Sequence, residues 1–328
     1  MMYRSARIWF LLAAGALLAS CNPHEFPTGE GDPAQDFSVR LVFEEDMESL
    51  TVDGQPATKA GRASLGYRYA VQLFRYHGES QFGLTPDYTY EFTRKSNVVA
   101  LDTTLYLAID PVKYQVYTWV DRLDEAGEPF YDASDFEDIR IGADYAAGAT
   151  ARDAFVGQTD LDLSGRYVAG DRLQRTLHLV RPVAQLRFVA PEALTFLSYT
   201  GGVGSDRMQA ELRYKEPVQD GYDIFRDRTC ATREGASVTM RPELDASGEL
   251  VFCSDFVFAP AGQDGTVDVE FRLTDLEGNP ISSFSGEVPV RRGWTTTVTF
   301  AIPDLGGGNK TSGIGINPGF DDEIEIQL

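Results

Sequence analysis

Cys21 has the most specific chemical context of any residue in this sequence. It follows Leu18-Ala19-Ser20, and the apolar run that ends there is preceded by Arg4 and Arg7. A basic start, a short apolar run, small residues and then a cysteine are typical of a bacterial lipoprotein signal that is cleaved before the cysteine. A retained anchor helix is the alternative, but the run is shorter than the roughly 20 apolar residues that span a bilayer. The pattern predicts a signal peptide over residues 1–20 and a diacylated N-terminus at Cys21.

Few residues of the sequence are suited to catalysis. The only histidines after the first 36 residues are His77 and His178. The sequence has no nucleophile elbow, phosphate-binding loop or zinc-protease motif. Acidic residues are so numerous that some pair of carboxylates will always lie close together. Such a pair is therefore no evidence for glycoside hydrolysis. The run Asp321-Asp322-Glu323 is acidic but lacks the spaced Asp/Asn-Gly loop of calcium sites, so a solvated turn is the simpler interpretation. We therefore expect no enzyme, no catalytic residue, no metal and no cofactor.

Two cysteines remain after the predicted cleavage, Cys230 and Cys253. In an oxidising compartment such a pair can form a disulfide. The alternative is two buried, unpaired thiols, because Cys253 lies in the apolar run Val251–Phe258. Neither a C-x-x-C motif nor a Cys/His cluster is present, so zinc is not expected.

Aromatic residues gather near the start of a long polar segment. Tyr117, Trp119 and Tyr131 could form a stacking platform for sugars. Aromatic residues at strand spacing more often belong to a core, so this platform and a core position are both open interpretations.

The net charge of the chain excludes one class of partner. The sequence has 29 basic and 50 acidic residues, and removing residues 1–20 takes away only Arg4 and Arg7, so the net charge falls from −21 to −23. Nucleic acids need clustered Lys and Arg. No such cluster is present, so we expect no nucleic-acid partner.

The hydrophobic pattern after residue 36 has a period of two almost throughout. Val267, Val269, Phe271 and Leu273 alternate with polar residues, as in a half-buried strand. Many short strands of this kind, separated by turn residues rich in Gly, Pro, Asn and Asp, predict an all-β protein built from sandwiches. Only residues 133–140 and 191–199 are briefly helical in pattern.

Three boundaries divide the chain into four segments in our prediction. Residues 21–36 are rich in Pro, Gly and acids and predict a flexible tether. Pro182 interrupts a strand pattern and shifts the inward row by one residue, which indicates a bulge or a switch between sheets. We place one β-sandwich at 37–190 and a second at 191–328. Within the first, residues 120–172 are expected to be an elaborated loop with short strands.

Several short sequence motifs of this chain occur together in one known family. They are Tyr67-Arg68-Tyr69, Tyr114-Gln115-Val116-Tyr117-Thr118-Trp119, Arg152-Asp153-Ala154-Phe155, Leu179-Val180-Arg181-Pro182, Val288-Pro289-Val290-Arg291 and Pro318-Gly319-Phe320. Together with the signal before Cys21, they resemble the fimbrillin-like lipoproteins of Bacteroidales, which include fimbrial stalk, tip and anchor subunits. Gly293 stands where those proteins commonly have Asn. Because glycine adopts the same left-handed backbone, we expect the turn to be kept.

The resemblance implies two tandem transthyretin-like β-sandwich domains and a particular mode of assembly. The last strand, with Ile324, Ile326 and Leu328, either closes its own sheet or is donated to another subunit. The implied function is that of a non-catalytic surface lipoprotein in adhesion or fimbria-like assembly, held at the outer membrane and displayed on the cell. Its expected partners are the membrane, other fimbrial subunits and surface ligands. A glycan-binding lipoprotein of a polysaccharide-uptake system is the alternative function.

Overall fold

The protein is a β-protein with one short helix in the part of the chain that its structure describes. The computed structural model describes residues 38–45, 65–77, 82–96, 103–164, 172–200, 204–245, 247–262, 264–300, 312–317 and 324–326. Within these ranges the chain forms strands β1 to β21, the helix α1 (Ala193–Tyr199) and a single 3-10 turn (Ser205–Arg207). The all-β prediction is confirmed, and α1 confirms the helical pattern at 191–199. Residues 133–140 are not helical: they form turns that lead into β7 (Ile139–Ile141).

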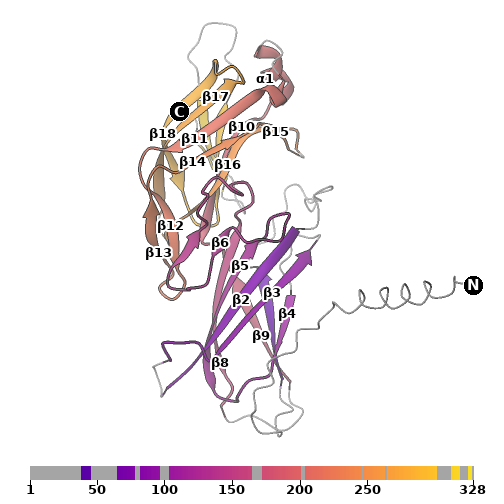
Figure 1. The fold of residues 1–328 in the computed structure, drawn as a ribbon, viewed down its shortest axis with the longest axis vertical. Coiled ribbons are helices and arrows are strands. Elements are labelled where there is room, and N and C mark those ends of the chain that lie inside the picture. Colours follow the sequence, from indigo (N-terminus) through magenta and orange to yellow (C-terminus); the bar gives the residue numbers. More distant parts are fainter. Residues whose placement is uncertain are drawn as a thin grey trace, which may run out of the picture.

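Two sheets make up the N-terminal half (Figure 1). One has the order β4-β1-β9, with strands Thr103–Leu107, Ser38–Glu45 and Arg172–Leu179. The other has the order β3-β2-β5-β8, with strands Tyr88–Ser96, Leu65–Arg75, Lys113–Arg122 and Ala154–Asp162. Alternate side chains of both sheets meet in one core that includes Val71, Val116, Leu161, Leu177 and Leu179.

Two further sheets make up the C-terminal half. The larger has the order β15-β16-β10-β19-β20-β21, with strands Glu243–Leu244, Leu250–Phe258, Val183–Ala190, Thr295–Phe300, Ser312–Asn317 and Ile324–Ile326. The smaller has the order β14-β11-β17-β18, with strands Ser237–Met240, Met208–Tyr214, Gly265–Asp275 and Pro280–Val290. Phenylalanines from the two sheets pack between them: the rings of Phe188 and Phe271 stack at 4.9 Å, and Phe300 lies 5.0 Å from Phe271.

A fifth sheet joins the two halves. Its order is β13-β12-β7-β6, with strands Arg228–Arg233, Val218–Asp223, Ile139–Ile141 and Tyr131–Asp132. Two of these strands precede Pro182 in the sequence and two follow it. Figure 1 shows β6, β12 and β13 at the level where the halves meet. We call this sheet the bridging sheet.

The chain passes from one half to the other at Pro182. Strand β9 ends at Leu179 in the first core, and β10 begins at Val183 in the larger C-terminal sheet, where it pairs with β16 and β19. Of the two predicted alternatives at Pro182, a bulge or a switch between sheets, the structure shows the switch, because β9 and β10 belong to different sheets. The chain therefore enters the C-terminal sheets at Val183, before residue 190, where we expected the first sandwich to end.

Candidate functional site

The aromatic residues predicted as a glycan platform are buried where the two halves meet. Tyr117, Trp119 and Tyr131 are 4%, 0% and 2% exposed, so the platform prediction is wrong. Strand β5 is buried on both faces: Val116 faces the N-terminal core, whereas Trp119 packs with its ring centroid 5.2 Å from that of Tyr131. The aromatic row left outside the first core is thus covered by another part of the same chain.

The cover includes two parts of the chain. One is the insert at residues 123–153, which carries β6 and β7. The other is the β12–β13 hairpin, whose turn residue Phe225 places its ring 4.7 Å from Tyr117 and 5.3 Å from Phe74. We call this contact region, with the buried charges described next, the joint.

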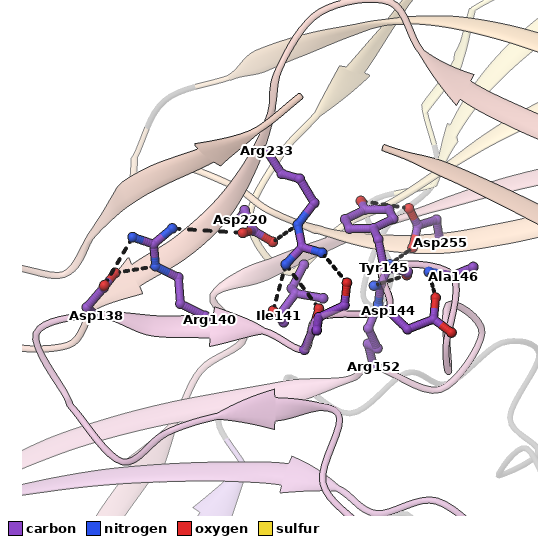
Figure 2. A network of polar contacts seen from close by, with 12 residues as sticks. Asp138, Arg140, Ile141, Asp144, Tyr145, Ala146, Arg152, Asp220, Arg233 and Asp255 are labelled. Carbon is purple, nitrogen blue, oxygen red and sulfur yellow. Dashed lines mark hydrogen bonds and ion pairs between the residues drawn. The ribbon is translucent and has the colours of Figure 1, made fainter. Parts of the chain in front are cut away.

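A buried ion pair crosses the joint (Figure 2). The guanidinium of Arg152, on the insert, pairs with the carboxylate of Asp255 on β16, and both side chains are 0% exposed. The hydroxyls of Tyr145 and Tyr214 donate to Oδ2 of Asp255 at 3.0 and 2.7 Å. Burial, together with the Asp255 charge, raises the pKa of both tyrosines well above the usual value, so they remain hydrogen-bond donors.

Arg152 has other acceptors besides Asp255. Its Nη1 donates to the carbonyl of Tyr145 at 2.5 Å, and the guanidinium lies 4.3 Å from the centroid of the Tyr145 ring. Burial lowers the pKa of this arginine, but the interactions with Asp255, Tyr145 and Tyr131 together outweigh burial, so the pKa is raised overall. Arg152 is therefore a fixed cation inside the joint.

A second arginine binds the insert from the C-terminal side. Arg233, on β13, pairs through Nε with Asp220 at 3.0 Å and donates to the carbonyls of Ile141, Gly142 and Ala143 at 2.9 to 3.0 Å. Figure 2 shows Arg233 between Asp220 and the backbone of β7. The same view shows Arg140, which donates to Asp138 and reaches Asp220 at 3.9 Å. One hydrogen-bonded network thus includes residues from both halves.

A third arginine holds the insert onto the N-terminal sheet. Arg68 on β2 binds Asp121 on β5 through two bonds of 2.9 Å and donates to the carbonyl of Tyr131 at 2.9 Å. Burial raises the pKa of Asp121 to about 6, with Arg68 opposing the shift. An open pocket of about 360 Å³ lies beside this pair and includes Glu91 and Phe130 in its wall.

Several of the motifs that carry the family resemblance meet at this joint. Asp153 accepts two hydrogen bonds from Arg181, at 2.9 and 3.1 Å, and the carbonyl of Arg181 accepts one from Nε of Arg292 at 2.8 Å. The amide of Gly293 donates to the carbonyl of Val183 at 2.8 Å, and its φ of 75° is left-handed, as expected for this turn. The sequence contained these residues as motifs but gave no indication that they bind one another.

The remaining site residues are placed as follows. Cys230 on β13 is exposed and Cys253 on β16 is buried, and both are free, so they do not form the disulfide. They lie in different sheets, and the Cys230 thiol donates to Asp138 at 3.3 Å. Ile324 and Ile326 form β21, which pairs with β20 of the same chain. Cys21, the 1–20 signal, the 21–36 tether, Asp321–Glu323 and Leu328 lie outside the described residues.

The chemistry available at the joint is that of fixed ion pairs. In the described ranges no three His, Cys, Asp or Glu side chains are grouped to hold a metal ion, and His77 and His178 are both exposed. In the same ranges no helix is long and apolar enough to cross a membrane. The arrangement of cations, carboxylates and rings can therefore resist relative movement of the two halves.

Comparison with known proteins identifies the family. A model of a family of unknown function, DUF6562, matches residues 32–328. The chain belongs to this family. None of the curated proteins compared matches it.

Several solved structures from Bacteroidales are similar to this chain. One is a candidate adhesin from Bacteroides thetaiotaomicron, 12% identical, with a TM-score of 0.46 over 88% of this chain and 97% of that one. A fimbrial assembly protein from Parabacteroides distasonis is 11% identical, with a TM-score of 0.43 over 89% and 98%. The fimbrial anchor protein Mfa2 from Porphyromonas gingivalis is 11% identical, with a TM-score of 0.38 over 88% and 99%.

Proposed function

We propose that this member of the DUF6562 family is a non-catalytic surface lipoprotein that acts in adhesion or fimbria-like assembly. The lipid is expected on Cys21, and residues 21–36 would hold the folded body away from the membrane. One acyl chain on a cysteine gives reversible membrane binding, whereas two acyl chains give stable attachment. The partners are expected to be other subunits or surface ligands.

The observation that carries the proposal is the position of β21. It is three residues long, forms the edge of the six-stranded sheet and pairs only with β20 among the described strands. So short a strand contributes few backbone hydrogen bonds to its own sheet. It can therefore be exchanged for pairing with another subunit at a low cost in stability, as in β-augmentation.

The joint supports a role that involves force. A subunit that links a membrane to an external surface is pulled along its length, and the weakest contact along that direction yields first. Here the contact between the halves contains a shared sheet, buried ion pairs and packed rings, so the two halves resist separation.

Removal of the last strand tests the assembly proposal. Deleting residues 318–328 is expected to abolish co-assembly with partner subunits while secretion continues, because only the edge strand and its connection are lost. Glu325→Gln serves as the matched control, since it keeps the strand and its backbone. Polymer or complex formation that is unchanged in the deletion variant would contradict strand donation.

The anchor has a separate test. Cys21→Ala is expected to abolish incorporation of labelled palmitate and to release the protein from the membrane fraction. Cys230→Ala, which removes an exposed thiol, is the control and should leave both unchanged. Palmitate incorporation that persists in Cys21→Ala would refute the lipoprotein assignment without bearing on strand donation.

A further inference from the structure

Strand β18 is the longest edge strand in the part of the chain that the structure describes. It has 11 residues, whereas the next longest edge strands, β3 and β8, have nine. It pairs with β17 on one side and, among the described strands, with none on the other. An unpaired strand edge exposes a row of backbone donors and acceptors that another strand can bind.

The outward backbone groups can be assigned from the hydrogen bonds of the neighbouring strand. The carbonyl of Asp268 accepts from the amide of Lys215, which follows β11, so Asp268 on β17 points away from β18. Because the direction alternates along a strand, Val267 and Val269 point toward β18, where Val288 and Gly286 are their partners. The residue between those partners, Glu287, therefore directs its N–H and C=O outward, and so does Ser285 on the other side of Gly286.

The same alternation assigns the rest of the edge. Ser283 and Glu287 point outward with Ser285, and so does Pro289. Pro289 agrees with this assignment, since it has no N–H to give to β17 and its carbonyl instead accepts from Oγ1 of Thr296 at 2.6 Å. The open edge thus offers the backbone groups of Ser283, Ser285 and Glu287.

The middle of this edge lacks the features that usually block strand addition. From Ile281 to Gly286 the strand has no charged residue, and its pairing with β17 is regular from Ser282 to Val290. The other long edges carry exposed charges, for example Glu91 on β3 and Asp160 on β8. Charges, prolines and bulges are the usual protection of edges, so the middle of β18 is unprotected by comparison.

Phe284 gives the edge an apolar component. Its side chain is only partly buried, and it packs against the C-terminal core with its ring 6.4 Å from that of Phe188. An added strand would cover its uncovered side and extend the core by one strand. The edge therefore offers both hydrogen bonds and apolar surface to a partner strand.

We propose that a second copy of this chain binds here, with the two β18 strands antiparallel about a two-fold axis near Phe284 and Ser285. An edge that pairs with itself in this way forms a closed, isologous dimer. The chain has a net charge of −21, so two copies repel wherever their acidic surfaces face each other, and the uncharged middle of β18 allows a close approach. The pairing places Glu287 of each copy opposite a neutral residue. The open edge has only this one carboxylate, so it offers little charge complementarity to a cationic partner of another kind.

Cross-linking of the full-length protein in its membrane tests the dimer. Cys230→Ser first removes the exposed native thiol, and Ser285→Cys then places a thiol at the proposed two-fold axis. A short bismaleimide is expected to convert most of this variant to a covalent dimer. Thr239→Cys in the same background is the matched control, because Thr239 is exposed on β14 at the opposite edge of the same sheet. It should give at least tenfold less dimer.

A backbone variant separates strand pairing from simple proximity. Ser283→Pro removes an outward N–H and none that bonds to β17, as Pro289 already does, so it should keep the fold and its melting temperature. Added to Ser285→Cys, it is expected to lower the yield of dimer at least tenfold. Equal cross-linking at Ser285→Cys and Thr239→Cys, no cross-linking at Ser285→Cys, or a yield that Ser283→Pro leaves unchanged would each overturn the proposal.

Discussion

Three arginines hold the joint, and each has a different set of acceptors. Arg152 binds a carboxylate and a carbonyl, Arg233 binds a carboxylate and three carbonyls, and Arg68 binds a carboxylate and one carbonyl. A planar guanidinium has five donors in fixed directions, so it can join several segments at once where a lysine cannot. These residues fix the insert at 123–153 against both halves.

Asp255→Asn is expected to destabilise the protein strongly. The change leaves the guanidinium of Arg152 buried without its counter-charge, and such losses cost about 3–5 kcal/mol. Urea denaturation would measure this as a fall in the free energy of unfolding. The control is Asp264→Asn, whose partner Arg291 lies 3.6 Å away in an exposed pair, and it should cost less than about 1 kcal/mol. Equal effects of the two variants would mean that the buried pair does not stabilise the joint.

Asp121 predicts a pH dependence of stability. Burial raises its pKa to about 6 in the folded protein, above the value near 4 in an unfolded chain. The folded state then holds the proton more tightly, so the contribution of Asp121 to stability is present below about pH 4 and is lost as the pH rises to 6. Denaturation of the wild type and of Asp121→Asn across this range should show the wild type losing stability relative to the variant. A difference that stays constant with pH, or grows as the pH rises, would contradict the shifted pKa.

The sequence identified residue types at the joint better than their roles. Arg152, Asp153 and Arg181 could be recognised because they belong to motifs of a family. Their residue types also showed that the two arginines could pair with carboxylates. Their partners could not be predicted, because Arg152 and Asp255 are 103 positions apart and no local pattern relates them. The stacking platform was wrong for the same reason: alternation placed Tyr117 and Trp119 on one face of a strand but could not show what covers that face.

At the scale of elements, regular alternation was a reliable guide. It predicted β17 and the change of sheet at Pro182, because each of those strands buries one face and the buried row is visible in the sequence. It missed β8, whose residues Ala154–Gly157 are all buried, since a strand covered on both faces shows no alternation. It also missed β12 and β13, which pair across the joint with strands of the other half.

Gly157 on β8 lies directly against the backbone and side chains of β9. A Cβ built there would lie 2.8 Å from the carbonyl of His178 and against the Leu177 and Leu179 side chains. Gly157→Ala is therefore expected to lower the free energy of unfolding by about 1–3 kcal/mol, through overpacking. Gly66→Ala is the control, since its new Cβ would meet only the movable end of Leu123, at 3.1 Å. Thermal melting of both variants would compare them, and a control as unstable as Gly157→Ala would exclude backbone crowding as the cause.

At the scale of the whole molecule, the bridging sheet makes the two halves interdependent. Strands β6 and β7 belong to the insert of the first half and pair with each other, yet β7 also pairs with β12 of the second half. We propose Pro182 as the boundary between halves, since β10 belongs to the C-terminal sheets. Neither half then keeps its own complete set of pairings when the other unfolds.

Unfolding of the whole molecule is therefore expected to be a single cooperative transition. Calorimetry should give equal calorimetric and van't Hoff enthalpies, because losing either half exposes the rings and ion pairs of the joint. Phe225→Ala removes the ring that packs 4.7 Å from Tyr117. This variant should therefore have a lower melting temperature than the wild type. Leu276→Ala, in an exposed hairpin turn, is the control and should leave the transition unchanged. Two well-separated transitions in the wild type would show that the halves unfold independently, and the joint could then not transmit force as one unit.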